Sequence, residues 1–168
     1  MNLEKCKEPR FVDVRYIYNK YADMNFEVVK KCPACAMGVF KRDKTGNITE
    51  MLMIKEWRAG LNNEDGTLGG FTYGSPAGLL ENGENPEDGI IREFVEETGY
   101  KASDIVDIKN LGEYYPSIGF SSEVLHIYSC VVDEDAVREQ PKFDGTGETI
   151  IGWEWVPVED VPKYAKGF

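Results

Sequence analysis

The chain has 168 residues and a formal net charge of −11, and its residues are 42% apolar and 12% aromatic. This composition excludes a disordered polypeptide, and the length suits one domain with a substantial core. The acidic balance argues against nucleic-acid and anionic-membrane partners, which require basic patches. No stretch approaches about 18 apolar residues and the first residues lack a signal-peptide apolar region, so we expect a cytoplasmic protein.

Residues 10–31 are expected to form one or two strands, because aromatic and apolar residues recur there as anchors. Cys32-Pro33-Ala34-Cys35 follows, with the spacing of a zinc knuckle or a redox pair. Its natural second pair is absent, since Cys6 and Cys130 stand alone, and the chain continues as a strand rather than a helix. We therefore expect these cysteines to be small buried hydrophobic side chains.

The remaining segments predict one mixed α/β domain over residues 1–168. Strand character is found in residues 36–40, 51–57, 107–115, 124–132 and 149–156. A turn is expected over 42–47 and a closing helix over 158–165. Residues 59–72 are rich in Gly, Asn and Asp without periodicity, which predicts a flexible loop. The only histidine, His126, lies in a predicted strand, where a structural role is expected.

The clearest local signal is for a helix after Asn85. Asn85 is a good N-cap, Pro86 suits the first helical position and Gly99 supplies the stop. At about 100° per residue, the apolar side chains gather on one side of this helix. That predicted core face consists of Ile90, Ile91, Phe94, Val95 and Thr98.

The opposite side of the predicted helix carries three carboxylates. Glu93 and Glu97 are one turn apart, and Glu96 lies beside them. Hard oxygen ligands in such a patch suit Mg²⁺ or Mn²⁺, and a bound divalent ion would reconcile the acidic chain with a phosphate substrate. Gly89 is on the same side, where its missing side chain would let a ligand or a loop come close. We expect an acidic, exposed helix face.

The spacing around this helix resembles a known motif. Gly78, five residues, Glu84, seven residues and then Arg92-Glu93-Phe94-Val95-Glu96-Glu97-Thr98-Gly99-Tyr100 resembles the Nudix box of the Nudix hydrolases at every specified position. The resemblance implies an α/β/α sandwich around a mixed sheet and hydrolysis of a nucleoside diphosphate linked to another moiety. It also implies that Glu93 and Glu97 are the principal metal ligands.

The same resemblance implies further roles inside the motif. Glu96 would be an additional metal ligand and a candidate catalytic group, and Arg92 would pair with Glu84 to hold the loop. Ser75-Pro76-Ala77-Gly78 resembles the start of the motif in ADP-ribose pyrophosphatases, where the alanine carbonyl is a metal ligand. Ala77 occupies the matching position.

Segments outside the motif indicate a nucleotide-sugar substrate. Residues 112–123 resemble the segment after the motif in ADP-ribose pyrophosphatases, with Pro116 sixteen residues past Tyr100. Tyr115, Pro116 and Glu123 are therefore candidate substrate-binding residues. Residues 54–58 resemble the strand that often reads glutamine-tyrosine-arginine, which adds Trp57 and Arg58, although a surface salt bridge is an equal alternative for Arg58.

Three further expectations follow from the resemblance. The glutamate usual two residues before the proline of the subfamily is Gly74 here, which leaves one contact unaccounted for. A glutamate on a later loop activates the water, and Glu148 matches it, with Asp144 and Glu123 as alternatives. The N-terminal strands would pack across a partner, which predicts a homodimer.

Several functions stay open at this stage. The first is hydrolysis of ADP-ribose or an ADP-sugar to AMP and a sugar phosphate. A Nudix hydrolase of a nucleoside triphosphate or dinucleotide cofactor is a second, because loops outside the motif select the substrate. A nucleotide-sensing module without catalysis and a zinc-ribbon interaction protein are the others.

Overall fold

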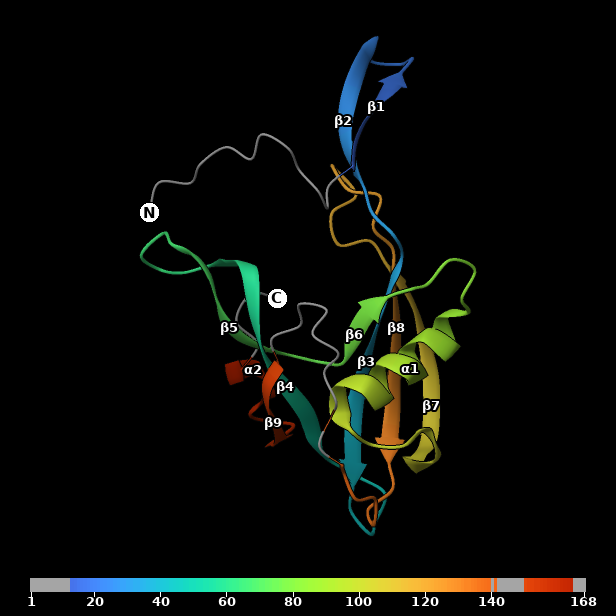
Figure 1. Cartoon of the computed structure of the whole chain (residues 1–168), viewed down its shortest axis with the longest axis vertical. Coiled ribbons are helices and arrows are strands. Elements are labelled where there is room, and N and C mark those ends of the chain that lie inside the picture. Colours follow the sequence, from blue (N-terminus) through green and yellow to red (C-terminus); the bar gives the residue numbers. More distant parts are fainter. Residues whose placement is uncertain (1–12, 140, 142–149, 165–168) are drawn as a thin grey trace.

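The computed structural model describes residues 13–139, 141 and 150–164, whose strands form two sheets (Figure 1). The elements are β1 (Asp13–Asn19), β2 (Met24–Lys30), β3 (Ala34–Arg42), β4 (Ile48–Asn62), β5 (Leu68–Gly74), β6 (Ala77–Leu79), α1 (Pro86–Thr98), the short 3₁₀ turn Ala102–Asp104, β7 (Ile105–Tyr114), β8 (Leu125–Val132), β9 (Ile150–Pro157) and α2 (Val161–Tyr164). Within these residues, no helix is long and apolar enough to cross a bilayer.

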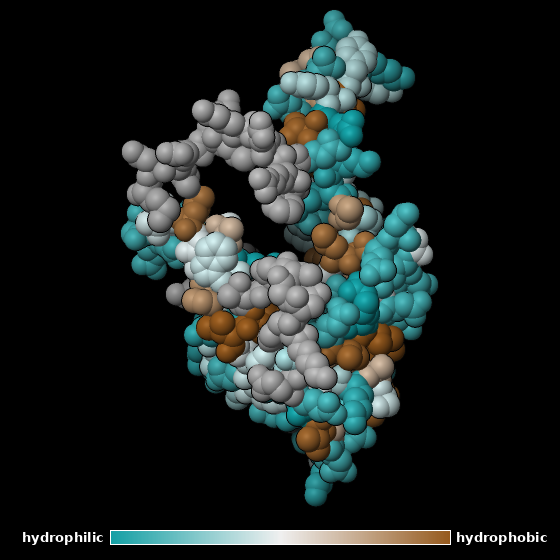
Figure 2. All heavy atoms as spheres, in the orientation of Figure 1, coloured by the Kyte–Doolittle hydropathy of each residue, from teal (hydrophilic) through white to brown (hydrophobic). Residues whose placement is uncertain are grey.

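The N-terminal hairpin projects from the body of the molecule (Figures 1 and 2). β1 and β2 pair antiparallel along their whole length, which confirms the strands predicted within residues 10–31. The end of β2 is tied to the segment before β8: Val29 N–H donates to the Phe120 carbonyl at 2.7 Å, and Ser122 N–H donates to the Val29 carbonyl at 3.0 Å. An isolated two-stranded hairpin is marginally stable, so these bonds hold it to the body.

The larger sheet is mixed, as predicted. Its main path is β5-β4-β3-β8-β7, with β6 paired to β3 and β9 paired to β4. β3 and β8 run parallel, whereas the other described pairs in this sheet are antiparallel. The five strands predicted after residue 35 correspond to β3, β4, β7, β8 and β9, and the predicted turn after β3 is present. The fold class predicted from the sequence is confirmed.

The larger sheet divides between β3 and β4. β4 pairs with β3 only near its start, from Ile48 to Met51, and then continues beside β5. β6 pairs with the beginning of β3, which β4 does not reach, and Ala77 lies opposite Ala36. Met37 N–H donates to the Pro76 carbonyl at 2.9 Å and holds the crossing from β5 to β6. This crossing brings β6 into contact with α1.

The core lies between β3 and α1. Cys35, Met37 and Val39 are fully buried and alternate with partly exposed residues along β3, the pattern of a strand with one face in the core. Ile90 and Phe94 of α1 are fully buried in the same cluster. Burial of side chains of this size contributes about 1.5–3 kcal/mol each. This packing sets the rotation of α1 about its axis, and with it the direction of the carboxylates.

Two predicted segments differ from the structure. The flexible loop expected over residues 59–72 is mostly strand, because β4 continues to Asn62 and β5 begins at Leu68. Trp57 packs over Gly69, where an added Cβ would lie 2.7 Å from the indole. The packing of the Trp57 ring over Gly69 thus stabilises the β4–β5 hairpin, whose sequence lacks an alternating apolar pattern. The predicted closing helix is reduced, in the described residues, to the single turn Val161–Tyr164.

Candidate metal and substrate site

The ends of α1 are formed by the residues that the sequence indicated. The Asn85 side chain accepts a hydrogen bond from Glu87 N–H at 2.9 Å, and Pro86 occupies the first turn. At the other end Gly99 has a φ of 75°, and its N–H donates to the Val95 carbonyl at 3.1 Å. The helix therefore begins and ends at fixed points, which places its carboxylates reproducibly.

Arg92 holds the loop between β6 and α1. Its guanidinium donates to both carboxylate oxygens of Glu84, at 3.0 and 3.1 Å, and to the Leu79 carbonyl at 3.2 Å. The bonds to Glu84 raise the pKa of Arg92, and the bond from Arg92 lowers the pKa of Glu84. Both groups therefore stay charged. The Arg92–Glu84 pair expected from the motif is present in the structure.

The loop approaches α1 at Gly89, as the sequence suggested. A Cβ at Gly89 would lie 2.5 Å from Leu80 Cδ2 and 3.0 Å from Glu84 Oε2. Gly89 lowers the stability of the helix by about 1 kcal/mol relative to alanine. The close packing of the loop against α1 explains why a glycine is present there.

Arg92 also neutralises part of the carboxylate patch. One of its terminal nitrogens lies 2.7 Å from Glu93 Oε1 and 3.1 Å from Glu96 Oε2. The Glu96 side chain is 58% exposed, whereas that of Glu93 is buried. The single positive charge of Arg92 therefore faces three carboxylates, those of Glu84, Glu93 and Glu96. The patch keeps a net negative charge.

Glu93 and Glu97 are buried, which corrects the expected exposed acidic face. Glu93 is 6% exposed and Glu97 4%, whereas Val95, expected in the core, is 37% exposed. Burial raises the pKa of Glu93, and the bond from Arg92 opposes that shift. The cause is the position of β6: its contact with α1 covers the side of the helix that the apolar pattern left open.

Gly78 makes room for the Glu93 carboxylate. A Cβ at Gly78 would lie 1.9 Å from Glu93 Oε1, so no other residue fits there without moving that carboxylate. Beside it, Glu97 Oε2 accepts a hydrogen bond from Ala77 N–H at 2.9 Å. The side chains of Glu93 and Glu97 are therefore both seated on β6, at the strand that carries the Ala77 carbonyl.

This donor set fits a divalent cation. Two buried carboxylates, a nearby exposed one and a main-chain carbonyl are the hard oxygen ligands that Mg²⁺ and Mn²⁺ prefer. In the described residues no three acidic, histidine or cysteine side chains are arranged to hold a metal ion, and Glu93 and Glu96 contact the Arg92 guanidinium. The buried charge that would favour a cation is nevertheless in place.

The predicted substrate residues Trp57 and Arg58 lie in β4, in the half of the sheet that β4 forms with β5 and β9. Arg58 forms an ion pair with Glu56 at 2.7 Å, which matches the surface-pair alternative, and Trp57 is 44% exposed. Sequence reasoning missed Glu56. The Glu56 side chain is only 13% exposed, and its Oε1 lies 3.4 Å from where a Cβ at Gly74 would be. Gly74 is the position at which the resembling subfamily usually has a glutamate.

The other predicted substrate residues follow β7. Tyr115 and Pro116 are exposed, and Tyr115 donates to Glu113 at 3.3 Å. Glu123 lies 4.0 Å from Lys31, at the base of the hairpin. The partners of Tyr115 and Glu123 both lie outside α1. Glu148 and Asp144 lie outside the described residues.

Two cysteines behave as predicted and one does not. Cys35 and Cys130 are buried, and burial raises the pKa of their thiols to about 11 and about 12. Cys32 is exposed, so its expected burial is wrong, and Cys6 lies outside the described residues. His126 in β8 has its imidazole 3.7 Å from Glu113.

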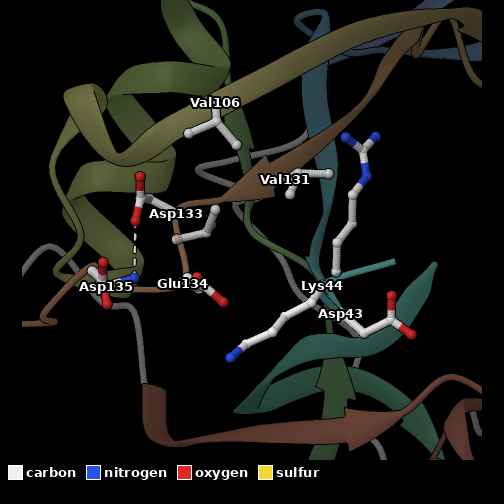
Figure 3. A pocket seen from close by; sticks show the side chains of 9 residues that line it. Asp43, Lys44, Val106, Val131, Asp133, Glu134 and Asp135 are labelled. Carbon is white, nitrogen blue, oxygen red and sulfur yellow. Dashed lines mark hydrogen bonds between the residues drawn. The ribbon is translucent and has the colours of Figure 1, made fainter. Parts of the chain in front are cut away.

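A separate hollow of about 330 Å³ lies where the turn after β3 meets the end of β8 (Figure 3). Its lining includes Asp43, Lys44 and Asp133 together with Val106 and Val131. The Asp133 carboxylate accepts a bond from Asp135 N–H at 2.9 Å, and Asp43 accepts bonds from its own turn. The carboxylates of Asp43 and Asp133 are therefore already hydrogen-bonded to backbone N–H groups of their own turns.

The fold and the arrangement of the carboxylates agree with a comparison against known protein families. A model of the NUDIX domain matches residues 33–167. The chain belongs to the Nudix family.

Its relatives include three named enzymes. The chain is 33% identical over 114 residues to the ADP-ribose pyrophosphatase of Bacillus subtilis, covering 68% of this chain and 55% of the relative. It is 30% identical over 105 residues to the ADP-sugar pyrophosphatase of Mus musculus, covering 58% and 41%. It is 36% identical over 85 residues to the GDP-mannose pyrophosphatase of Salmonella arizonae, covering 51% and 39%. The chain thus spans about half the length of these relatives or less.

Proposed function

We propose that this protein is a divalent-metal-dependent pyrophosphohydrolase that cleaves ADP-ribose or another ADP-sugar to AMP and a sugar phosphate. The observation that supports the proposal most is the seating of two buried carboxylates, Glu93 and Glu97, on β6 at Gly78 and Ala77. Two relatives named for ADP-ribose and ADP-sugar hydrolysis support the choice of substrate.

The proposed chemistry assigns a task to each group. Bound Mg²⁺ or Mn²⁺ would neutralise the diphosphate and lower the pKa of a water nucleophile. Glu93, Glu97 and the Ala77 carbonyl would hold the metal, with Glu96 as an additional exposed ligand. Arg92 keeps Glu84 and the loop beside these groups through its paired bonds. Its bond to Glu93 also opposes the rise in the Glu93 pKa that burial causes.

Glu148 is the proposed group that orients or activates the attacking water. The proposal rests on its match to the loop glutamate of the resembling enzymes, with Asp144 and Glu123 as alternatives. Glu148→Gln should lower kcat by at least about tenfold and leave Mg²⁺ affinity unchanged, since a base acts on the transition state. Weaker Mg²⁺ binding in this variant would instead make Glu148 a ligand.

A second copy of the chain is the proposed cover for the N-terminal hairpin. Tyr16, Ile17 and Tyr18 follow one another in β1 and are 71%, 55% and 60% exposed, so both faces of the hairpin are open. Aromatic residues exposed at this density are typical of interfaces. Sedimentation equilibrium tests the proposed homodimer, and a monomer at micromolar concentration would contradict it.

Product analysis tests the proposed substrate. With ADP-ribose and Mg²⁺ we expect AMP and ribose 5-phosphate, and no turnover in excess chelator. A competition assay at equal concentrations should favour ADP-ribose over ATP and NADH by at least about tenfold in kcat/KM, equivalent to about 1.4 kcal/mol. GDP-mannose belongs in the panel because one relative is named for it.

Each outcome of this competition has a distinct meaning. Faster consumption of ATP, NADH or GDP-mannose would replace the ADP-sugar substrate and leave a Nudix pyrophosphohydrolase. Tight binding of ADP-ribose without cleavage in the presence of Mg²⁺ or Mn²⁺ would indicate a nucleotide-sensing module.

A further inference from the structure

Trp153 of β9 holds the main chain of Glu97. Its indole N–H donates to the Glu97 carbonyl at 2.7 Å, and its ring packs partly buried against the core. This carbonyl lies in the last turn of α1, where carbonyl groups lack partners within the helix. The last turn of α1 also contains no basic residue to offset the negative end of the helix dipole. The indole therefore supplies a donor that the helix does not provide.

The side chain of Glu97 is held from another strand. Its Oε2 accepts the bond from Ala77 N–H of β6 at 2.9 Å, while its carbonyl accepts the bond from Trp153 of β9. β6 pairs with β3 and β9 pairs with β4, so the two strands belong to the two halves of the divided sheet. Both halves thus bind α1 at the same residue.

A third segment packs against this contact. The Arg138 guanidinium lies 4.4 Å from the centroid of the Trp153 ring, a cation–π distance. The next residue, Glu139, donates its N–H to the Gly99 carbonyl at 2.8 Å, just beyond the end of α1. The indole is therefore confined between the helix end and residues 138–139, and its N–H has a defined direction.

We propose that Trp153 is a positioning residue, which sets the place of the Glu97 carboxylate for a divalent cation by fixing the last turn of α1. The proposal rests on the metal-dependent function proposed above. Groups that orient metal ligands typically change metal affinity or activity about tenfold to hundredfold when they are replaced. The sequence placed Trp153 only within the predicted strand over residues 149–156, because its bonding partner lies 56 residues away.

The test compares Trp153→Phe with the matched control Trp155→Phe. Both changes remove an indole N–H from β9 and keep an aromatic ring. The Trp155 ring packs against the core and lies 4.3 Å from the Lys41 ammonium, whereas the described indole bond to Glu97 comes from Trp153. The probe is Mn²⁺ alone, titrated into the full chain and followed by electron paramagnetic resonance, with the metal-free melting temperature as the measure of folding.

We expect the Mn²⁺ dissociation constant to rise about tenfold in Trp153→Phe and by less than about twofold in Trp155→Phe. The two variants should melt within a few degrees of each other without metal. In a double-mutant cycle, Trp153→Phe should add little to the loss caused by Glu97→Gln, because it acts through that residue. Equal Mn²⁺ affinities of the two tryptophan variants, or a full additional tenfold loss in the Glu97→Gln background, would overturn the proposal.

Parallel ADP-ribose assays separate this inference from the proposed function. A wild-type protein that binds Mn²⁺ but does not cleave ADP-ribose would refute the substrate and leave the positioning test valid. Normal cleavage with no difference between the tryptophan variants would refute the positioning role alone. A wild-type protein that does not bind Mn²⁺ would overturn both.

Discussion

Glu97→Gln is expected to lower kcat for ADP-ribose by at least about a hundredfold and to leave the fold intact. Glu97 is 4% exposed, and its Oε2 accepts the bond from Ala77 N–H. Glutamine has nearly the same shape and keeps an oxygen for this bond. It lacks the charge that a hard divalent cation requires, so metal binding should weaken while packing is conserved.

Two measurements separate these effects. Steady-state rates over a Mg²⁺ titration report the loss of turnover, and melting temperatures with and without Mg²⁺ report metal binding to the folded state. Mg²⁺ should stabilise the wild type more than the variant. Glu87→Gln makes the same change at an exposed position in the first turn of α1 and should retain turnover within about twofold. Near-normal turnover of Glu97→Gln at saturating Mg²⁺ would remove Glu97 from the ligand set.

The local features of the site were predictable because they depend on short spacings. Asn85 and Gly99 cap α1 through bonds within a few residues, and Arg92 reaches Glu84 across eight residues. Each of these contacts follows from the chemistry of one turn or one loop. The strand β8 was predictable for a similar reason, since apolar residues dominate its sequence and all of its residues are buried or partly buried.

The burial of the carboxylates was not predictable from the helix pattern. A helical projection places Glu93 and Glu97 together but contains no information about what packs on them. The covering element is the three-residue strand β6, whose existence depends on pairing with β3 more than 40 residues earlier. The β4–β5 hairpin escaped prediction similarly, because Trp57 and Gly69 meet only once the strands are paired.

Gly78→Ala is expected to be the most damaging single-methyl addition in the site. The added Cβ would lie 1.9 Å from Glu93 Oε1 and 2.0 Å from its carboxyl carbon, so the Glu93 side chain must leave its position. The backbone of Gly78 is compatible with alanine, since its φ is not positive. The damage is therefore steric and directed at one carboxylate. We expect a loss of about 1–3 kcal/mol in unfolding free energy and a fall in kcat of at least about a hundredfold.

Urea denaturation and steady-state kinetics measure both effects, with Gly60→Ala as the control, since nothing lies within 4 Å of a Cβ at that position. A second change at Glu93 tests the cause. Glu93→Asp shortens the side chain by one methylene and withdraws the carboxylate from the added methyl group. Gly78→Ala should therefore destabilise the Glu93→Asp background less than the wild type, by a coupling energy of about 0.5–3 kcal/mol. Strictly additive free energies would show that Gly78 is required for a reason other than the space it gives to Glu93.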